Sequence, residues 1–189
     1  MESNSSKKQI LKEIFGYDSF RKGQEEIVDQ ILNGRDVLAI MPTGAGKSLC
    51  YQVPALLMSG ITIVVSPLIS LMIDQVKALN EAGVHAAYIN SALTERQITK
   101  ALELAAAGRY KMIYVAPERL LTPRFLDFAC HTELSMVTID EAHCISQWGQ
   151  DFRPSYVKIT EFISQLPRRP VVSAFTATAT QKVREDILE

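Results

Sequence analysis

Short apolar runs alternate with longer amphipathic stretches along almost the whole chain. Each run has the length and the β-branched or aliphatic character of a buried strand. The runs that we predict as strands are residues 37–40, 61–65, 86–89, 112–115, 136–139 and 171–175. Helical patterns fill most of the intervals, at residues 47–58, 68–82, 94–106, 125–129 and 156–165. This alternation predicts an α/β fold with right-handed crossovers and a mainly parallel sheet that has helices on both faces.

Two further helices are expected before the first strand. The first has Ser6 and Gln9 in a capping-box pattern, so it should begin at Ser6 and run toward Phe15. The second covers residues 24–32 and is stopped by Asn33-Gly34. The sequence has no Pro-, Gly- or Ser-rich linker, and we expect one domain over residues 1–189 that includes the helices of residues 1–33.

Composition adds little to this picture. The 20 basic residues nearly balance the 21 acidic ones, so contact with nucleic acid would depend on local placement of charge. Residues 48–73 carry no charge, but Pro54, Gly60 and Pro67 interrupt them, which favours a buried core over a membrane span. The first six residues are polar and lack the basic and apolar regions of a signal peptide. We therefore expect an intracellular protein with no membrane partner.

The segment after the first predicted strand has the features of a phosphate-binding loop. Its residues are Thr43, Gly44, Ala45, Gly46, Lys47 and Ser48. Backbone N–H groups of such small residues can surround phosphates, and the following helix adds the positive end of its dipole. Lys47 would neutralise the β- and γ-phosphates of a nucleoside triphosphate, and the Ser48 hydroxyl would ligate magnesium. The alternative, a plain glycine-rich turn, accounts for the glycines but not for Lys47-Ser48, although Met41 stands where the strict pattern has glycine.

A second chemical feature follows the strand predicted at residues 136–139. That strand delivers Asp140 and Glu141 to a strand end, where charged side chains would be unfavourable in an ordinary core. Asp140 suits the magnesium shell, directly or through water, and Glu141 suits positioning and deprotonating an attacking water. A surface acidic pair at the start of a loop is the alternative. Because Lys47 and Ser48 occur in the same chain, we favour a hydrolytic site that uses ATP and Mg²⁺.

Several motifs occur in an order that resembles the superfamily-two helicases. They are the phosphate-binding loop, Ser66-Pro67-Leu68-Ile69-Ser70-Leu71, Ala116-Pro117-Glu118-Arg119-Leu120, Asp140-Glu141-Ala142-His143 and Thr176-Ala177-Thr178. Further segments narrow the resemblance to the RecQ DNA helicases, and it covers nearly the whole chain. These segments are Phe15-Gly16-Tyr17, Phe20-Arg21, Gly23-Gln24 and the tract from Gln147-Trp148-Gly149 to Arg153-Pro154.

The resemblance implies a RecA-like P-loop NTPase lobe, the first motor lobe of a helicase. The intact protein would couple ATP hydrolysis to translocation on single-stranded DNA, and would unwind duplex DNA with 3′ to 5′ polarity in recombination or repair. It would work where chromosomal DNA is, in the cytoplasm and nucleoid or in the nucleus. Such helicases also carry a second RecA-like lobe with an arginine finger. We expect that lobe to be absent from this chain, so the isolated first lobe should be largely inactive.

By the same resemblance, the N-terminal helices recognise adenine through Tyr17, Arg21 and Gln24. The chemistry agrees, because a glutamine amide can donate to N7 and accept from N6 of adenine, while an aromatic ring or a guanidinium can stack on the base. The alternative is that Phe15, Tyr17 and Phe20 only pack the first helix against the domain, which we expect of Phe15 and Phe20.

The tract from His143 to Arg153 resembles an aromatic-rich loop that reports bound single-stranded DNA to the ATP site. Its predicted members are His143, Gln147, Trp148, Phe152 and Arg153. An exposed Trp148 or Phe152 would stack on an unpaired base for about 1–3 kcal/mol, with Arg153 on a phosphate or a base face. Core packing is the usual role of a lone tryptophan, but the polar residues beside Trp148 favour a loop.

Other residues in or beside the family motifs are implied to contact the DNA backbone or to couple the two sites. They are Ser66, Ser70, Gln75, Asn90, Ser91, Arg119, Thr176 and Thr178. Short hydroxyls and amides hold phosphates without reading sequence. Each could instead be a helix cap, and Ser66 before Pro67 is a natural candidate for one.

Three positions depart from the family pattern. Ala45 replaces a frequent glycine and is tolerated only if the backbone there avoids positive φ. Ile73 replaces a common lysine and removes one possible phosphate contact, and Gln150 replaces a frequent histidine, so no proton-dependent coupling is assigned to it. Two other functions stay open. One is a lobe of a DEAH-type RNA helicase, against which the tract from Gln147 to Pro154 argues, and the other is a non-catalytic, ATP-gated DNA-binding module.

Overall fold

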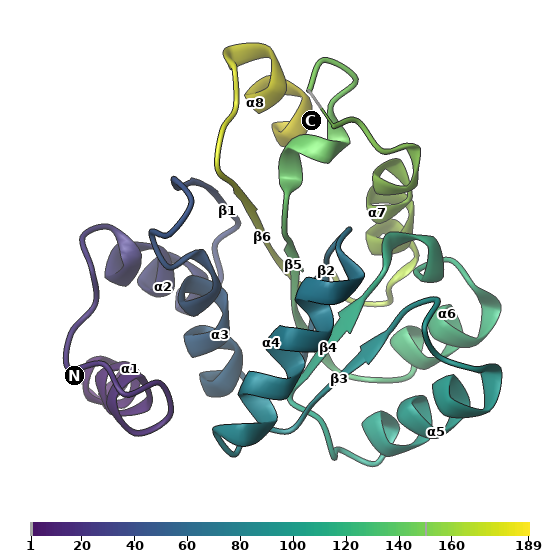
Figure 1. The fold of residues 1–189 in the computed structure, drawn as a ribbon, viewed down its shortest axis with the longest axis horizontal. Coiled ribbons are helices and arrows are strands. Elements are labelled where there is room, and N and C mark those ends of the chain that lie inside the picture. The colour runs from purple at the N-terminus through teal and green to yellow at the C-terminus, as the bar shows by residue number, and fades with distance from the viewer. Residues whose placement is uncertain (1, 150) are drawn as a thin grey trace.

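The computed structural model describes residues 2–149 and 151–189, with the backbone alone for residues 2–5. Its centre is a sheet of six parallel strands in the order β1-β6-β5-β2-β4-β3 (Figure 1). The strands are β1 (Val37–Ile40), β2 (Ile61–Val65), β3 (Ala86–Ile89), β4 (Met112–Val115), β5 (Leu134–Ile139) and β6 (Val171–Thr176). In a parallel sheet all carboxyl ends lie at one edge, so the loops that follow the strands are brought together there.

Helices cover both faces of the sheet (Figure 1). One face carries α3 (Lys47–Leu57) and α4 (Ile69–Glu81), and the other carries α5 (Glu95–Ala106), α6 (Pro123–Cys130) and α7 (Pro154–Gln165). Outside α3 lie α1 (Glu2–Glu13) and α2 (Gln24–Leu32), which pack through Leu11, Val28 and Val53. The remaining elements are the short 3₁₀ turns η1 (Pro117–Arg119) and η2 (Ala142–Ile145), and the last helix, α8 (Gln181–Leu188).

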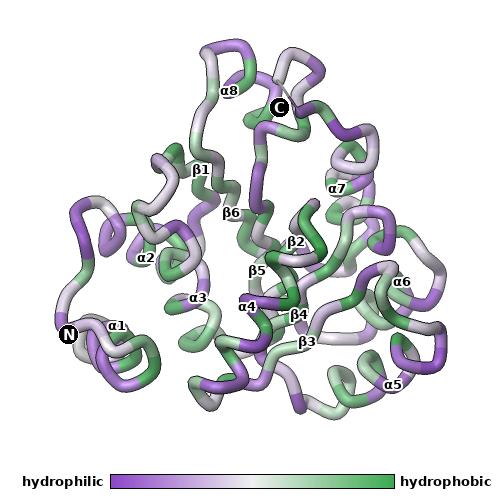
Figure 2. The backbone as a smooth tube through the Cα atoms, viewed as in Figure 1, coloured by the Kyte–Doolittle hydropathy of each residue, from purple (hydrophilic) through white to green (hydrophobic). Residues whose placement is uncertain are grey.

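The central strand β2 consists mostly of hydrophobic residues, which are green in Figure 2. Every residue of β2 is buried, with Ile63 in the core on the α5–α7 face and Val64 in the core on the α3–α4 face. The uncharged residues 48–73 thus form most of α3, all of β2 and the start of α4, and of these β2 is wholly buried whereas Leu68 and Ile69 are exposed. No described helix is long and apolar enough to cross a membrane.

The six predicted strands are confirmed, but several helix boundaries are wrong. α1 begins at Glu2, so Ser6 lies inside the helix and not at its start. Serine costs a helix only a few tenths of a kcal/mol relative to alanine, which is too little to end one. α6 and α7 begin at Pro123 and Pro154, each two residues before the predicted start, because proline at the first helical position already has the φ angle that a helix needs.

The last helix, α8, was not predicted. Its N-cap is Thr180, whose side chain accepts a hydrogen bond from the backbone N–H of Val183 (3.4 Å). α8 packs against η2, the turn that follows β5. The segment after the Thr176-Ala177-Thr178 motif is therefore part of the structure around the acidic pair.

Candidate functional site

The predicted phosphate-binding loop joins β1 to α3 at the carboxyl edge of the sheet. Gly44 and Gly46 have φ angles of +83° and +77°, a conformation that residues with a side chain rarely adopt. Ala45 lies between them but is not among the positive-φ residues of the described chain, so the alanine there is tolerated as expected. α3 begins at Lys47, which places the N-terminus of an eleven-residue helix directly behind the loop.

The acidic pair lies opposite this loop. The side chain of Asp140 is 7% exposed, and its Oδ1 accepts the backbone N–H of Glu141 (3.0 Å). The hydroxyl of Tyr156 donates to the backbone carbonyl of Asp140 (2.8 Å) and fixes the end of β5 from α7. Glu141 has φ of +52°, the one positive value at a non-glycine residue in the described chain, and its Oε1 is 3.8 Å from Nζ of Lys47. The fold therefore joins the two motifs that the sequence placed in one site.

The electrostatics of this pair suit a divalent cation. Burial raises the pKa of the Asp140 carboxyl, the neighbouring carboxylate of Glu141 raises it further, and the ammonium of Lys47 opposes the rise. A buried carboxylate under such strain would be stabilised by a bound cation. In the described part of the chain, no group of three or more His, Cys, Asp and Glu side chains could hold a metal ion. The oxygen ligands that the two motifs offer to a cation are the carboxylate of Asp140 and the hydroxyl of Ser48.

His143 connects the acidic pair to the end of β6. Its Nδ1 is 2.9 Å from Oγ1 of Thr176, whose hydroxyl donates to the backbone carbonyl of Thr178 (3.0 Å). Because that bond uses the hydroxyl proton, His143 must donate from Nδ1 to Thr176. The same Nδ1 is 3.4 Å from Oε2 of Glu141, and Nε2 is 3.8 Å from Oδ2 of Asp151. The structure thus brings Thr176 to Glu141 and His143, although 33 positions separate Thr176 from His143 in the sequence.

The loop after η2 presents Trp148 to solvent. Its side chain is 65% exposed, so the core-packing alternative is wrong. Lys182 of α8 places Nζ 3.5 Å from the centroid of the ring, and covers one face of the indole. The hydroxyl of Ser146 accepts the backbone N–H of Trp148 (3.2 Å) and donates to Asp186 of α8 (2.5 Å). Gln150, the departure in this loop, lies outside the described residues.

This arrangement matches one known family of proteins. A model of the DEAD/DEAH box helicase family matches residues 21–187. The chain belongs to this family. A crystal structure of the DUF1998 helicase MrfA bound to DNA and AMPPNP aligns with 96% of this helicase domain and 27% of that protein, with a TM-score of 0.75 at 17% identity. The predicted RecA-like fold is therefore confirmed.

Sequence similarity places the helicase domain beside the RecQ proteins. It is 51% identical over 179 residues to the ATP-dependent DNA helicase RecQ of Bacillus subtilis (strain 168). It is 50% identical over 179 residues to the protein of the same name from Pasteurella multocida (strain Pm70). The alignments cover 94% and 95% of this chain, but only 30% and 28% of the two relatives. The resemblance to RecQ helicases is confirmed, and the chain spans less than a third of their length.

Two of the three residues predicted to recognise adenine, Arg21 and Gln24, contact the phosphate-binding loop of the helicase domain. Tyr17 is 49% exposed and free to stack, and Nη1 of Arg21 donates to the carbonyl of Gly44 (2.8 Å). Gln24 differs from expectation, because it is buried and its amide is used within the protein. Its Nε2 donates to the carbonyls of Gly46 (3.0 Å) and Ala45 (3.3 Å), and its Oε1 accepts the backbone N–H of Arg21 (2.8 Å). In this structure, Gln24 holds the loop.

The residues predicted to contact DNA differ in their accessibility. Ser70, Ser91, Gln147 and Thr178 are exposed, Phe152 and Arg153 are half-buried, and Ser66 and Thr176 are buried. Ser66 is not the N-cap of α4, which is Leu68; its hydroxyl accepts the backbone N–H of Leu68 (3.5 Å). Asn90 is also buried, and its Oδ1 accepts the backbone N–H of Ala92 (2.9 Å), so it shapes the loop after β3.

Gln75 belongs to a buried polar network that the sequence did not predict. Its Oε1 accepts the hydroxyls of Tyr51 (3.0 Å) and Tyr114 (2.8 Å), and lies 3.4 Å from Nε2 of Gln52, which also donates to the hydroxyl of Tyr114 (3.0 Å). Burial raises the pKa of Tyr114 to about 12, so the phenol stays protonated. This network ties α3, α4 and β4 together, and Gln75 has only its amide N–H groups left for DNA.

Several side chains around the site were not predicted from the sequence. They are Tyr156, Lys182 and Asp186 around the acidic pair and the aromatic-rich loop, and Glu95, Thr99 and Arg124 around Arg119. None belongs to a motif by itself, because each acts on a residue from another element. The one local signal was Pro154, since a helix that begins there places Tyr156 in its first turn, near the end of β5.

Proposed function

We propose that this chain is the nucleotide-binding lobe of a RecQ-type, ATP-dependent DNA helicase. The whole protein would move along single-stranded DNA with 3′ to 5′ polarity and separate duplex strands during recombination or repair, at the chromosomal DNA inside the cell. The observation that carries this proposal is the contact of Lys47 with Glu141 (3.8 Å) beside the buried Asp140. This contact unites a phosphate-binding cation with a carboxylate pair suited to hydrolysis.

The side chains divide the hydrolysis of ATP between them. Lys47 binds the β- and γ-phosphates, and these contacts replace its weak contact with Glu141. Glu141 then accepts the proton of the attacking water as that water bonds to the γ-phosphorus and the bond to ADP breaks. Asp140 and Ser48 would hold magnesium, which neutralises charge on the phosphates. Tyr17 and Arg21 would bind the adenine. Gln24 would support the loop, and its amide would reach the base edge only by giving up its bonds to the carbonyls of Ala45 and Gly46.

The DNA strand would lie along the same edge of the sheet. Trp148 offers the face of its ring opposite Lys182 to an unpaired base, and Ser70, Ser91 and Arg119 offer polar groups to the backbone. The tract from Gln147 to Pro154 and the names of the relatives, ATP-dependent DNA helicases, favour DNA over the RNA alternative. Those names also favour a motor over a non-catalytic module.

Unwinding would require a second RecA-like lobe. The first lobe supplies Lys47, Ser48, Asp140 and Glu141, whereas an arginine from a second lobe typically contributes about 10³–10⁵ in rate. We therefore propose that the isolated chain binds nucleotide weakly and hydrolyses it poorly. A separately expressed second lobe would restore activity.

Two substitutions in the full-length protein test the proposal. Lys47→Ala should remove most of the ATP affinity or turnover, and Glu141→Gln should keep ATP binding but lose hydrolysis, because an amide cannot act as a base. The matched controls are Lys77→Ala and Glu81→Gln, an exposed ion pair on α4. Binding is measured with a fluorescent ATP analogue, and turnover as phosphate release with single-stranded DNA present. ATP hydrolysis at the wild-type rate in both site variants would refute the assignment.

A further inference from the structure

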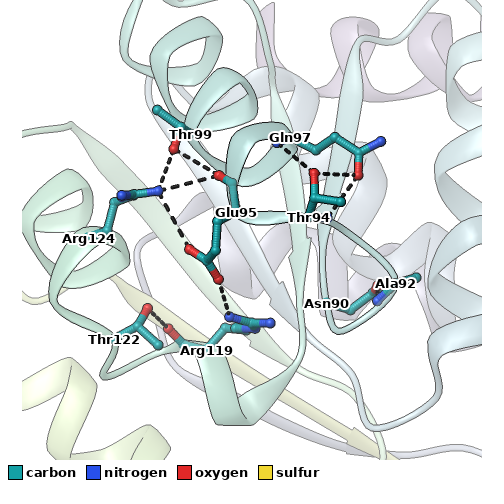
Figure 3. Close-up of polar contacts among 9 residues, drawn as sticks. All are labelled: Asn90, Ala92, Thr94, Glu95, Gln97, Thr99, Arg119, Thr122 and Arg124. Carbon is teal, nitrogen blue, oxygen red and sulfur yellow. Dashed lines mark hydrogen bonds and ion pairs between the residues drawn. The ribbon is translucent and has the colours of Figure 1, made fainter.

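A second charged cluster lies at the carboxyl edge of the sheet, beyond the ATP site. Figure 3 shows the carboxylate of Glu95 between two arginines from other segments. Oε1 of Glu95 is 3.3 Å from Nη1 of Arg119, and Oε2 is 3.6 Å from Nη1 of Arg124. Arg124 also donates to the backbone carbonyl of Glu95 (3.4 Å) and to the hydroxyl of Thr99. We call these four residues the Glu95 cluster.

The neighbouring polar groups already have other partners. Thr94 caps α5 and forms a reciprocal capping box with Gln97, so neither competes for the arginines (Figure 3). The hydroxyl of Thr122 donates to the carbonyl of Arg119 (2.7 Å) and steadies the turn that carries this arginine. The backbone carbonyl of Glu95 thus holds the guanidinium group of Arg124, and Glu95 is the carboxylate that both arginines contact.

The cluster has an excess of positive charge and is open to solvent. Two guanidinium groups share one carboxylate, whose side chain is 72% exposed, and Glu95 is also the first residue of α5, where the helix dipole favours an anion. Exposed ion pairs of this type are weak, so a competing anion can replace the carboxylate. A phosphodiester group offers two oxygens with the same charge and a similar spacing, which suits arginine.

The position of the cluster fits a strand that passes along the sheet edge. Arg119 follows β4 and Glu95 follows β3, the two strands at the opposite end of the sheet from β1 and its phosphate-binding loop. Ser66 and Ser70 follow β2, which pairs with β4. A single strand bound by the serines and by Arg119 therefore continues onto Arg124.

The geometry points to a gated phosphate clamp in which Arg119 and Arg124 bind one backbone phosphate of single-stranded DNA, and Glu95 occupies their guanidinium groups until that phosphate displaces it. This inference rests on the proposed function, and adds Glu95 and Arg124, which no motif assigned to DNA. Glu95 thus lowers DNA affinity. It holds both arginines ready for a phosphate.

The test measures binding of a fluorescent oligothymidylate to the full-length protein over a range of salt concentrations. Glu95→Gln keeps a hydrogen-bonding oxygen but removes the competing charge, so affinity should rise about 2- to 30-fold, the range for releasing two exposed ion pairs. The control Glu103→Gln removes the same charge from the same helix, where the carboxylate contacts Lys100 (3.8 Å), and should change affinity less than about twofold.

Arg124→Gln should weaken binding and reduce the slope of log affinity against log salt by about 0.7, the value for one lost contact with a single-strand phosphate. Arg109→Gln is its control, since Arg109 lies just before β4, at the amino edge of the sheet. Equal affinities of Glu95→Gln and Glu103→Gln would overturn the clamp, as would a gain from Glu95→Gln that survives in an Arg119→Gln/Arg124→Gln background. A folded wild-type protein that binds no single-stranded DNA would instead refute the proposed function, and the clamp with it.

Discussion

Replacing Gln24 with alanine should weaken the grip on the phosphates of the nucleotide and not only the grip on its base. The side chain of Gln24 is 2% exposed, and its amide makes three hydrogen bonds, two of them to carbonyls of the phosphate-binding loop. A Cβ atom built on Gly46 would clash with this amide, which shows how closely Gln24 packs on the loop. Gln24→Ala therefore removes a direct support of the segment that surrounds the phosphates.

The size of the effect follows from these bonds. A buried hydrogen bond contributes about 0.5–1.5 kcal/mol net, so the loss of three should destabilise the fold by about 1–3 kcal/mol after some replacement by water. For a domain of this size, each kcal/mol lowers the melting temperature by about 2–4 °C. In the variant, nucleotide binding would also have to order the phosphate-binding loop. If this costs as much as one hydrogen bond, about 1 kcal/mol, the affinity for the nucleotide falls about fivefold.

The assay compares ATP, GTP and inorganic tripolyphosphate as ligands of the wild type and of Gln24→Ala. Support of the loop predicts that the affinities for all three fall by a similar factor, whereas recognition of the adenine edge alone predicts a loss for ATP only. Gln30→Ala is the matched control, because Gln30 lies on the same helix and contacts only the exposed Arg35 (3.2 Å) among the side-chain bonds described. Unchanged tripolyphosphate affinity in a folded Gln24→Ala protein would refute the structural role.

Two further changes test other parts of the molecule. Trp148→Ala in the full-length protein should raise the single-stranded DNA concentration needed for half-maximal ATPase activity about 5- to 150-fold, the equivalent of about 1–3 kcal/mol of stacking. Trp148→Phe keeps an aromatic ring and should keep most of the affinity. Equal curves of ATPase activity against DNA concentration for the wild type and Trp148→Ala would refute stacking. Burial raises the pKa of the Asp36 carboxyl, but hydrogen bonds from Arg169 and from a backbone N–H of β6 lower it more, so its contribution to stability is present above about pH 4 and is lost as pH falls through the lowered pKa. Asp36→Asn should therefore lower the free energy of unfolding by about 0.2–1 kcal/mol at neutral pH and leave it unchanged in acid. The measurement is urea unfolding at both pH values, with the exposed Asp18→Asn as the control. An equal decrease at the two pH values would contradict the assignment.

The sequence predicted the strands well because most of them are buried on both faces. Their apolar runs have to be continuous, and turn residues separate them clearly. Helix starts were harder to locate, because the first backbone N–H groups of a helix have no hydrogen-bond partner within it. The first turn therefore accepts proline and polar residues that are also typical of loops. Pro123 and Pro154 interrupt the apolar pattern and yet begin α6 and α7. α8 was missed because its eight residues bury only Val183.

The site was predictable where one motif carries the chemistry and was not where partners come from different elements. Parallel strands put Lys47 and Glu141 at the same sheet edge, so their meeting follows from the topology. The bonds from Gln24 to its loop, and the approach of Arg124 to Glu95, depend on how α2 and α6 pack. Side-chain directions at that level are not encoded in periodicity, and only the folded structure supplies them.

Glu141 offers a physical route between the two proposed binding events. Its carboxylate lies between Lys47 (3.8 Å) and Nδ1 of His143 (3.4 Å), in a backbone conformation that is unfavourable for a glutamate. A phosphate that binds Lys47 leaves Glu141 beside Nδ1 of His143 (3.4 Å), and this nitrogen is hydrogen-bonded to Thr176 (2.9 Å). His143 lies in the 3₁₀ turn η2, and the loop that carries Trp148 begins at the end of this turn. A base that displaces the loop would therefore also displace η2. Because such coupling is reciprocal, a change that makes DNA tighten ATP binding must make ATP tighten DNA binding by the same factor.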